Sequence, residues 1–198
     1  VVGEAYNTPG ESNMVYTPPP PVINEFSAST TGTDVEYIEI FGATETDYSA
    51  YTVLEIEGDS GTSLGVIDSV IAVGTTDTNG LFLASLPANE LENGTLSLLL
   101  VREFTGTLGD DLDTNDDGIF EVMPWTDMVD SVAVNDGGAG DLAYGNTVLV
   151  GNFDGLSSFA PGGASRIPDG FDTDTITDWA LNDFVLGGIP GYTGTLVE

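Results

Sequence analysis

The chain has 198 residues, of which 40% are hydrophobic, so it can bury a sizeable core and extended disorder is disfavoured. Its 33 Asp and Glu residues stand against two Arg, with no Lys and no His, and the formal net charge is −31. A surface this anionic repels phosphate backbones and anionic lipid headgroups, so we expect no direct nucleic-acid binding and no membrane insertion. The chain also has no Cys, which excludes disulfides and thiolate nucleophiles.

The excess of negative charge opposes the compact state by self-repulsion, so the native surroundings should supply screening ions. Two compatible interpretations fit: a halophile-like surface that stays solvated, or an extracellular protein loaded with divalent cations. No apolar run predicts a membrane span and no leader precedes Val1, so any export signal has been removed or lies outside this sequence. We expect an extracellular or cell-surface location. Asn93-Gly94-Thr95 matches a glycosylation acceptor, a short pattern that also arises by chance.

Residues 1–21 differ from the rest of the chain, and we expect an extended N-terminal arm and linker ahead of one domain over 22–198. The prolines at 18–21 predict a polyproline spacer, because proline can neither donate to a β-ladder nor continue a helix. The strand-like start, V-V-G-E-A-Y at 1–6, either closes the chain's own sandwich or adds a strand to the sheet edge of a neighbour. Donation would be head-to-tail and would generate filaments unless the rotation closes.

The body of the chain shows strand signals and almost no helical periodicity. Short segments rich in β-branched and aromatic residues, most of them bounded by Gly, Asp, Asn or Pro, predict strands at 22–28, 35–41, 51–57, 65–73, 81–85, 95–104, 128–134 and 146–150. Residues 35–40 alternate as a half-buried strand does, whereas Leu98 to Val101 are continuously apolar and predict a central strand covered on both faces. Many short strands at this spacing predict an all-β, antiparallel β-sandwich with long acidic loops.

Several segments resemble lamin-tail domains of the bacterial secreted kind. They are V-I-N-E-F at 22–26, E-Y-I-E-I at 36–40, R-I-P-D-G at 166–170 and D-W at 178–179. The resemblance covers roughly residues 22–190 and implies an immunoglobulin-like sandwich that serves as an attachment or architectural module. Residues 104–160 are longer than the compact family form.

The two ends of the chain carry a second resemblance. In several relatives a G-[IV]-P-G segment leads into G-E-A-x-N-T-P-G, whereas here G-I-P-G stands at 188–191 and G-E-A-Y-N-T-P-G at 3–10. The arrangement implies a repeat unit cut out of register, or a subunit whose closing piece comes from a neighbour.

The strongest local motif is D-D-L-D-T-N-D-D-G-I-F-E at 110–121. Asp113, Asn115 and Asp117 occupy positions 1, 3 and 5 of a calcium loop, with Gly118 at position 6 for the sharp turn. The remaining candidate ligands are the carbonyl of Ile119 at position 7, Glu121 at position 9 and Asp111 just before the loop. Oxygen ligands on alternate residues suit Ca²⁺, so we expect calcium here.

Position 12 of this loop is Pro124 instead of a bidentate Glu, so a helix-loop-helix site is not predicted and the site would be a free-standing variant. A chance Asp-rich turn is the alternative. A second acidic group, Asp169, Asp172 and Asp174, lacks the spacing and is expected to be solvated or to cap turns. Arg166 should lie among carboxylates in a surface ion pair that contributes little.

Catalysis has weak support, and we expect no enzyme. Without His or Cys a Ser or Asp nucleophile lacks its usual partner, and no G-x-S-x-G segment occurs. Trp125 and Trp179 could stack on sugars, although burial in a sandwich is their commoner fate. Two function classes stay open: a self-associating structural or adhesive module, and a non-catalytic binding accessory of a secreted hydrolase that acts on glycans or nucleic acid. A surface glycan or protein is the partner that either class would contact.

Overall fold

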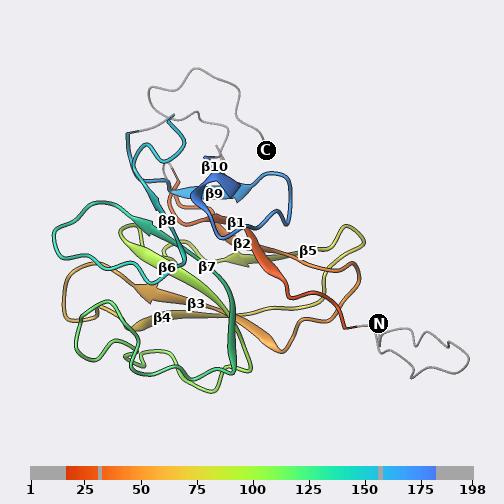
Figure 1. Cartoon of the computed structure of the whole chain (residues 1–198), viewed down its shortest axis with the longest axis horizontal. Helices are drawn as coiled ribbons and strands as arrows, with labels where there is room; N and C mark the ends of the chain where they lie inside the picture. The colour runs from red at the N-terminus through yellow and green to blue at the C-terminus, as the bar shows by residue number, and fades with distance from the viewer. Residues whose placement is uncertain (1–16, 31–32, 156–157, 182–198) are drawn as a thin grey trace, which may run out of the picture.

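The computed structural model describes residues 17–30, 33–155 and 158–181. Ten strands and one short 3₁₀ helix, η1 (Ile176–Asp178), make up the regular structure of this part of the chain (Figure 1). The strands are β1 (Val22–Ser27), β2 (Glu36–Phe41), β3 (Tyr51–Glu57), β4 (Ile67–Ala72), β5 (Leu81–Leu86), β6 (Leu96–Arg102), β7 (Asp127–Asn135), β8 (Thr147–Val150), β9 (Gly163–Arg166) and β10 (Trp179–Leu181).

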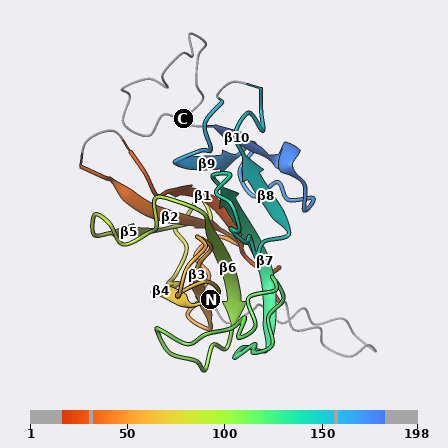
Figure 2. The same ribbon diagram turned by 90° about the vertical axis from the view of Figure 1, so that its left-hand side faces the viewer.

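The strands form two five-stranded sheets that pack face to face as a β-sandwich (Figures 1 and 2). One sheet has the order β10-β9-β1-β2-β5 and is antiparallel throughout. The other has the order β4-β3-β6-β7-β8. Its last pair, β7 and β8, is parallel, because residues 136–146 return alongside β7 before β8 begins opposite Val132. The predicted all-β sandwich is therefore confirmed, and the expectation of purely antiparallel pairing is wrong for this pair.

All eight strands predicted from the sequence form within a few residues of their expected bounds. The prediction missed β9 and β10, which have four and three residues, too few to show an alternating pattern. They extend the first sheet beyond β1, where Ala164 pairs with both Phe26 and Leu181.

The inner core lies between the two sheets and follows from the alternation of the strands. Its buried side chains include Ile23, Phe26, Ile38, Ile40, Val53, Leu98, Leu100, Val132 and Leu149. A second core covers the opposite face of the β3–β6 sheet and includes Leu54, Ile56, Leu99, Val101 and Leu112. The apolar run of β6 thus divides its side chains between the two cores, which confirms the prediction of a strand covered on both faces.

Two buried carboxylates fix the connection between β5 and β6. Glu36, on the inner face of β2, accepts the backbone N–H groups of Asn89, Glu90 and Leu91 at 2.5, 2.9 and 2.8 Å. Glu55 of β3 accepts the N–H of Glu92 at 2.6 Å, while its second oxygen has no partner among the described residues. Burial and the neighbouring carboxylates outweigh this bond and raise the pKa of Glu55 to about 8.

The described part of the proline run lies against the body instead of standing away from it. Pro21 is buried, and the carbonyl of Pro19 accepts the hydroxyl of Tyr48 at 3.1 Å. The predicted arm at 1–13 and the G-I-P-G segment at 188–191 lie outside the described residues. Within the described ranges, no helix is long and apolar enough to span a membrane.

Candidate metal centre

Residues 103–126 connect β6 to β7 and cover the second core (Figure 1). Their packing against this core holds the acidic loop in place. Their backbone pairs with the start of β4: Ile67 donates to the carbonyl of Asp110, and Gly109 donates to that of Ile67, both at 2.9 Å. Leu112 donates to Gly65 at 3.0 Å and buries its side chain completely. The residue before Asp113 is therefore an apolar anchor, and the acidic turn begins from a fixed point.

Asp113 lies at the inner end of the turn and is fully buried. One oxygen, Oδ1, accepts the N–H of Asp117 at 3.1 Å. The other, Oδ2, accepts the N–H of Gly118 at 2.7 Å and the hydroxyl of Tyr144 at 2.9 Å. Gly118 has a φ of 87°, which glycine adopts without strain, so its predicted role in the sharp turn is confirmed.

The buried carboxylate of Asp113 is held in its charged form. Burial alone would raise its pKa, but the hydrogen bonds from Gly118, Tyr144 and Asp117 together lower the pKa below the usual value. The same contact acts in the opposite direction on its partner: burial and the Asp113 carboxylate raise the pKa of the Tyr144 hydroxyl, which stays a donor. A permanent negative charge therefore lies at the base of the loop.

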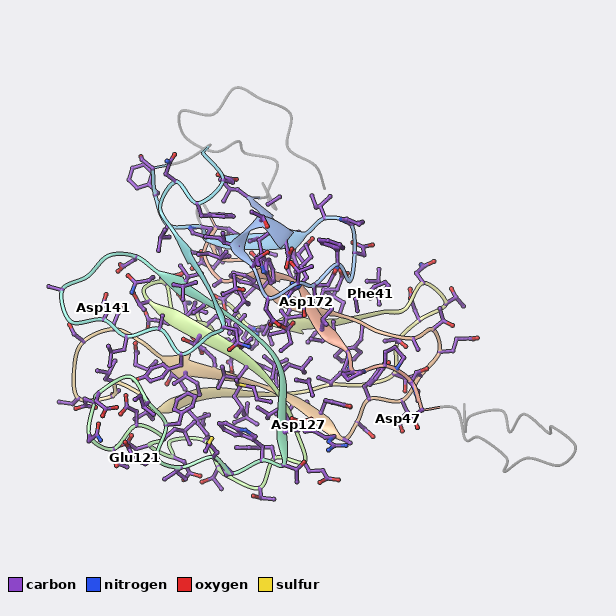
Figure 3. The ribbon with its side chains drawn as sticks, in the orientation of Figure 1. Phe41, Asp47, Glu121, Asp127, Asp141 and Asp172 are labelled. Atoms are coloured by element: carbon purple, nitrogen blue, oxygen red, sulfur yellow. The ribbon has the colours of Figure 1, made fainter. Side chains whose placement is uncertain are left out.

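Three carboxylates, that of Asp113 included, converge at this turn. Asp113, Asp117 and Glu121 each place one oxygen so that the three lie within 4.8 Å of one another. Glu121 is labelled in Figure 3, on the loop at the lower left. Of these three side chains, Asp113 is buried while Asp117 and Glu121 are exposed, so the group is open to solvent on its outer side.

The other predicted ligands are placed differently. Asn115 lies beside the cluster and donates its amide to Glu121 Oε1 at 2.8 Å. Asp111 accepts the N–H of Asp113 at 3.2 Å but is not one of the three converging carboxylates. Ile119 donates its N–H to Asp117 Oδ1 at 3.1 Å and has a strongly exposed side chain. The structure thus brings together positions 1, 5 and 9 of the predicted loop, with position 3 adjacent.

A cluster of this composition suits a hard cation. Three carboxylates offer oxygen ligands only. Ca²⁺ prefers oxygen ligands, whereas softer transition metals prefer nitrogen or sulfur. The Asp113 carboxylate has about four lone-pair sites, and three of them already accept hydrogen bonds, so about one remains to coordinate an ion. Sequence reasoning could not find Tyr144, because it lies 31 residues from Asp113.

A second buried acidic group surrounds Arg166, which is 1% exposed. Its guanidinium donates to both oxygens of Asp130, at 2.9 and 3.1 Å, and to Asp172 at 2.7 Å, and it lies 3.6 Å from Asp178. It also lies over the ring of Trp179, 4.6 Å from the centroid. The predicted carboxylate shell is confirmed, but the pair is buried and the surface position expected for it is wrong.

The residues of the second predicted acidic group have separate roles. Asp172 Oδ1 accepts the N–H of Asp174 at 3.0 Å in a turn, as expected, besides pairing with Arg166. Asp169 accepts the side-chain amide of Asn24 at 3.2 Å. Three carboxylates, those of Asp130, Asp172 and Asp174, also lie within 4.8 Å of one another, but here a protein cation already neutralises part of their charge.

A third group of carboxylates joins two loops that sequence spacing could not connect. Asp59 follows β3, whereas Asp136 and Asp141 follow β7, and one oxygen of each lies within 4.8 Å of the others. The hydroxyl oxygen of the fully buried Thr95 lies 3.2 Å from Asp136 Oδ1 and 3.1 Å from Asp141 Oδ2, so its single hydrogen can be donated to either carboxylate. Hydrogen bonds from Ser60 and Thr95 lower the pKa of Asp141. These carboxylates fasten the ends of three strands to one another.

Comparison of the chain with protein-family models, with curated proteins and with solved structures gave no match.

Proposed function

We propose that the chain is a non-catalytic, extracellular structural module of the lamin-tail kind, with an immunoglobulin-like sandwich and one Ca²⁺ ion at the Asp113 loop. The observation that carries the proposal is the convergence of Asp113, Asp117 and Glu121 on a turn whose base is a buried, charged carboxylate. An ion there would join the exposed part of the turn to its buried end. The loop covers the second core, so an ion bound to it would stabilise the whole sandwich.

The structural role is supported by where the acids lie. Buried Glu36 of β2 accepts backbone N–H groups of the loop at 89–91, and buried Asp113 accepts donors of its own turn and of Tyr144. Buried Asp130 of β7 joins strands, because it accepts the N–H of Ile23 in β1 and pairs with Arg166 in β9. Such contacts fix loops and strands in place. Self-association, head-to-tail through the arm at 1–13, is part of the proposed role as a building block of a surface layer or filament.

Calorimetric titration with Ca²⁺ tests the proposal. We expect one strong site per chain, which is lost in the double variant Asp117→Asn with Glu121→Gln. The matched control is Asp68→Asn with Glu103→Gln, which removes the same charge from two exposed residues outside all three carboxylate groups. Equal binding by both double variants would show that calcium binds through general charge, and the proposed site would be wrong.

A further inference from the structure

The edge strand β5 differs from the rest of this acidic surface. Its sequence, L-F-L-A-S-L, carries no charge, although the chain has a net charge of −31. It stands at the end of its sheet as described, pairs with β2 over six residues without a bulge, and lies at the left margin of Figure 2. Uncharged, regular edge strands are templates for further strand pairing.

The other three sheet edges are protected by known means. β4 has the exposed Asp68, and its pairing with β3 is interrupted by a bulge. β8 has four residues, and β10 has three in the described part of the chain, too few for a long ladder. Charge, bulges and short length are the usual ways in which proteins prevent edge pairing, and β5 has none of them.

The phase of the β2–β5 ladder shows which backbone groups of β5 face outward. The N–H of Gly42 donates to the carbonyl of Gly80 at 2.8 Å, which continues the register in which Phe41 opposes Leu81. Because hydrogen-bonded pairs alternate in an antiparallel ladder, Phe82, Ala84 and Leu86 bond to β2. The backbone groups of Leu81, Leu83 and Ser85 therefore point away from the sheet.

Asp77 already occupies the first of these outward positions. Its carboxylate accepts the N–H of Leu81 at 3.0 Å, and its own N–H donates to the carbonyl of Leu81 at 2.8 Å. In the part of the chain that the structure describes, the open positions are thus Leu83 and Ser85, and the side chain of Leu83 is 55% exposed. Together they offer two donors and two acceptors along an apolar strand.

We propose that β5 pairs antiparallel with β5 of a second copy, about a twofold axis at Ala84, so that the two five-stranded sheets join. In this register Leu83 opposes Ser85 of the second copy, and four backbone hydrogen bonds close around the axis. Phe82 opposes Leu86 of the second copy on the inner face, and the small Ala84 opposes itself. The contact is isologous and closed, unlike donation of the arm.

Local charge does not oppose a second copy at this edge. The paired strands bring no carboxylate opposite another, whereas the flanking Asp77 and Glu90 lie beyond the paired residues. Because each copy carries a net charge of −31, long-range repulsion still opposes the contact. Salt should therefore strengthen the dimer, since the Debye length falls to about 3 Å at about 1 M.

Sedimentation velocity of the full chain in about 1 M NaCl tests the pairing, and we expect a dimer that dissociates as salt is lowered. Leu83→Asp should abolish the dimer. Its matched control is Val70→Asp on the edge strand β4, which adds the same charge at an exposed aliphatic position and should leave the dimer intact. A wild-type monomer in high salt, or equal behaviour of the two variants, would overturn the proposal.

Cross-linking gives a second test that does not depend on tolerance of a charged residue. The chain has no Cys, so Ala84→Cys introduces the sole thiol. Directly opposed residues of this pair type have Cα atoms about 4.5 Å apart, within reach of a disulfide. We expect oxidation to give a covalent dimer with Ala84→Cys and none with Ser85→Cys, which is offset from its own copy. Equal cross-linking of both would contradict the register.

Two further variants separate this contact from the proposed function. The Asp117→Asn, Glu121→Gln variant should still dimerise, because the Asp113 loop lies on the other sheet. Deletion of residues 1–13 should also leave the dimer. Assembly that needs residues 1–13 but survives Leu83→Asp would assign self-association to the arm and overturn pairing through β5.

Discussion

The Arg166 cluster and the Asp113 loop each bury an aspartate in a strongly anionic protein, but they stabilise it differently. At Arg166 a guanidinium contacts both oxygens of Asp130, yet burial still raises the pKa of that carboxyl to about 6. At Asp113 the described partners are neutral donors, which hold the pKa low, and neither Arg of the described residues forms an ion pair with it. The first cluster carries its own cation. The second keeps the Asp113 charge beside two further carboxylates, and this is where the proposed external cation would bind.

Removing the internal cation should have the largest effect. Arg166→Met leaves Asp130 and Asp178 buried without a counter-charge, so the free energy of unfolding should fall by about 3–5 kcal/mol. Urea unfolding measures this change. Arg102→Met is the control, because it removes the other, exposed cation and gives the same net charge. Similar losses for both variants would contradict a special role for the Arg166 cluster.

Glu55 extends the comparison of buried acids. Among the described residues its carboxyl has no ion-pair partner, and one of its two oxygens accepts no hydrogen bond. Its pKa of about 8 in the folded chain exceeds the usual value of 4.5, so its proton stabilises the fold at low pH. As pH rises from 4.5 to about 8, wild-type stability should fall by about 1.4 kcal/mol per pH unit from this group.

Glu55→Gln keeps the shape and removes this titration. We therefore expect the free energy of unfolding of the variant to exceed that of wild type by about 3 kcal/mol at pH 8. At pH 5 the two should differ little. Urea unfolding at several pH values measures the difference. Glu103→Gln, at an exposed residue, serves as the control. A difference that does not change between pH 5 and pH 8 would show that Glu55 is not held protonated.

Tyr144 tests the neutral-donor half of the comparison. Tyr144→Phe removes the hydroxyl that donates to Asp113 Oδ2, so the unfolding free energy should fall by about 1.5–3 kcal/mol, the usual value for a hydrogen bond to a charged group. Tyr51→Phe is the control, since its hydroxyl has no hydrogen bond in the described part of the chain. Calcium in excess should reduce the Tyr144→Phe loss, because an ion bound at the cluster would stabilise the Asp113 carboxylate in place of the lost hydrogen bond.

The sequence predicted the strands well because their signals are local. Alternation at 35–41 and the apolar run of β6 each depend on neighbouring residues, and both form as expected. The very short β9 and β10 have no such signal. The parallel β7–β8 pair depends on the path of a loop, which composition does not determine.

The candidate site shows the same contrast between local signals, which the sequence reveals, and contacts between distant segments, which it does not. The spacing of Asp113, Asp117 and Gly118 within one turn was visible, and the turn forms. The residues that surround Asp113 are remote in sequence. Tyr144 comes from the β7–β8 connection, and Gly65, where an added Cβ would lie 2.7 Å from that of Asp113, comes from the segment just before β4. Such contacts arise from the packing of the sandwich, so one sequence alone could not predict them.

The most direct test of the account is the melting temperature of the wild-type chain in a calcium chelator and in excess Ca²⁺, beside the Asp117→Asn, Glu121→Gln variant. With calcium about a hundredfold above its dissociation constant, the ion should add about 2.7 kcal/mol, which raises the wild-type melting temperature by roughly 5–10 °C. The variant should melt at the same temperature in both buffers. A wild-type chain whose melting temperature does not respond to calcium, or a variant that responds as strongly, would contradict the account.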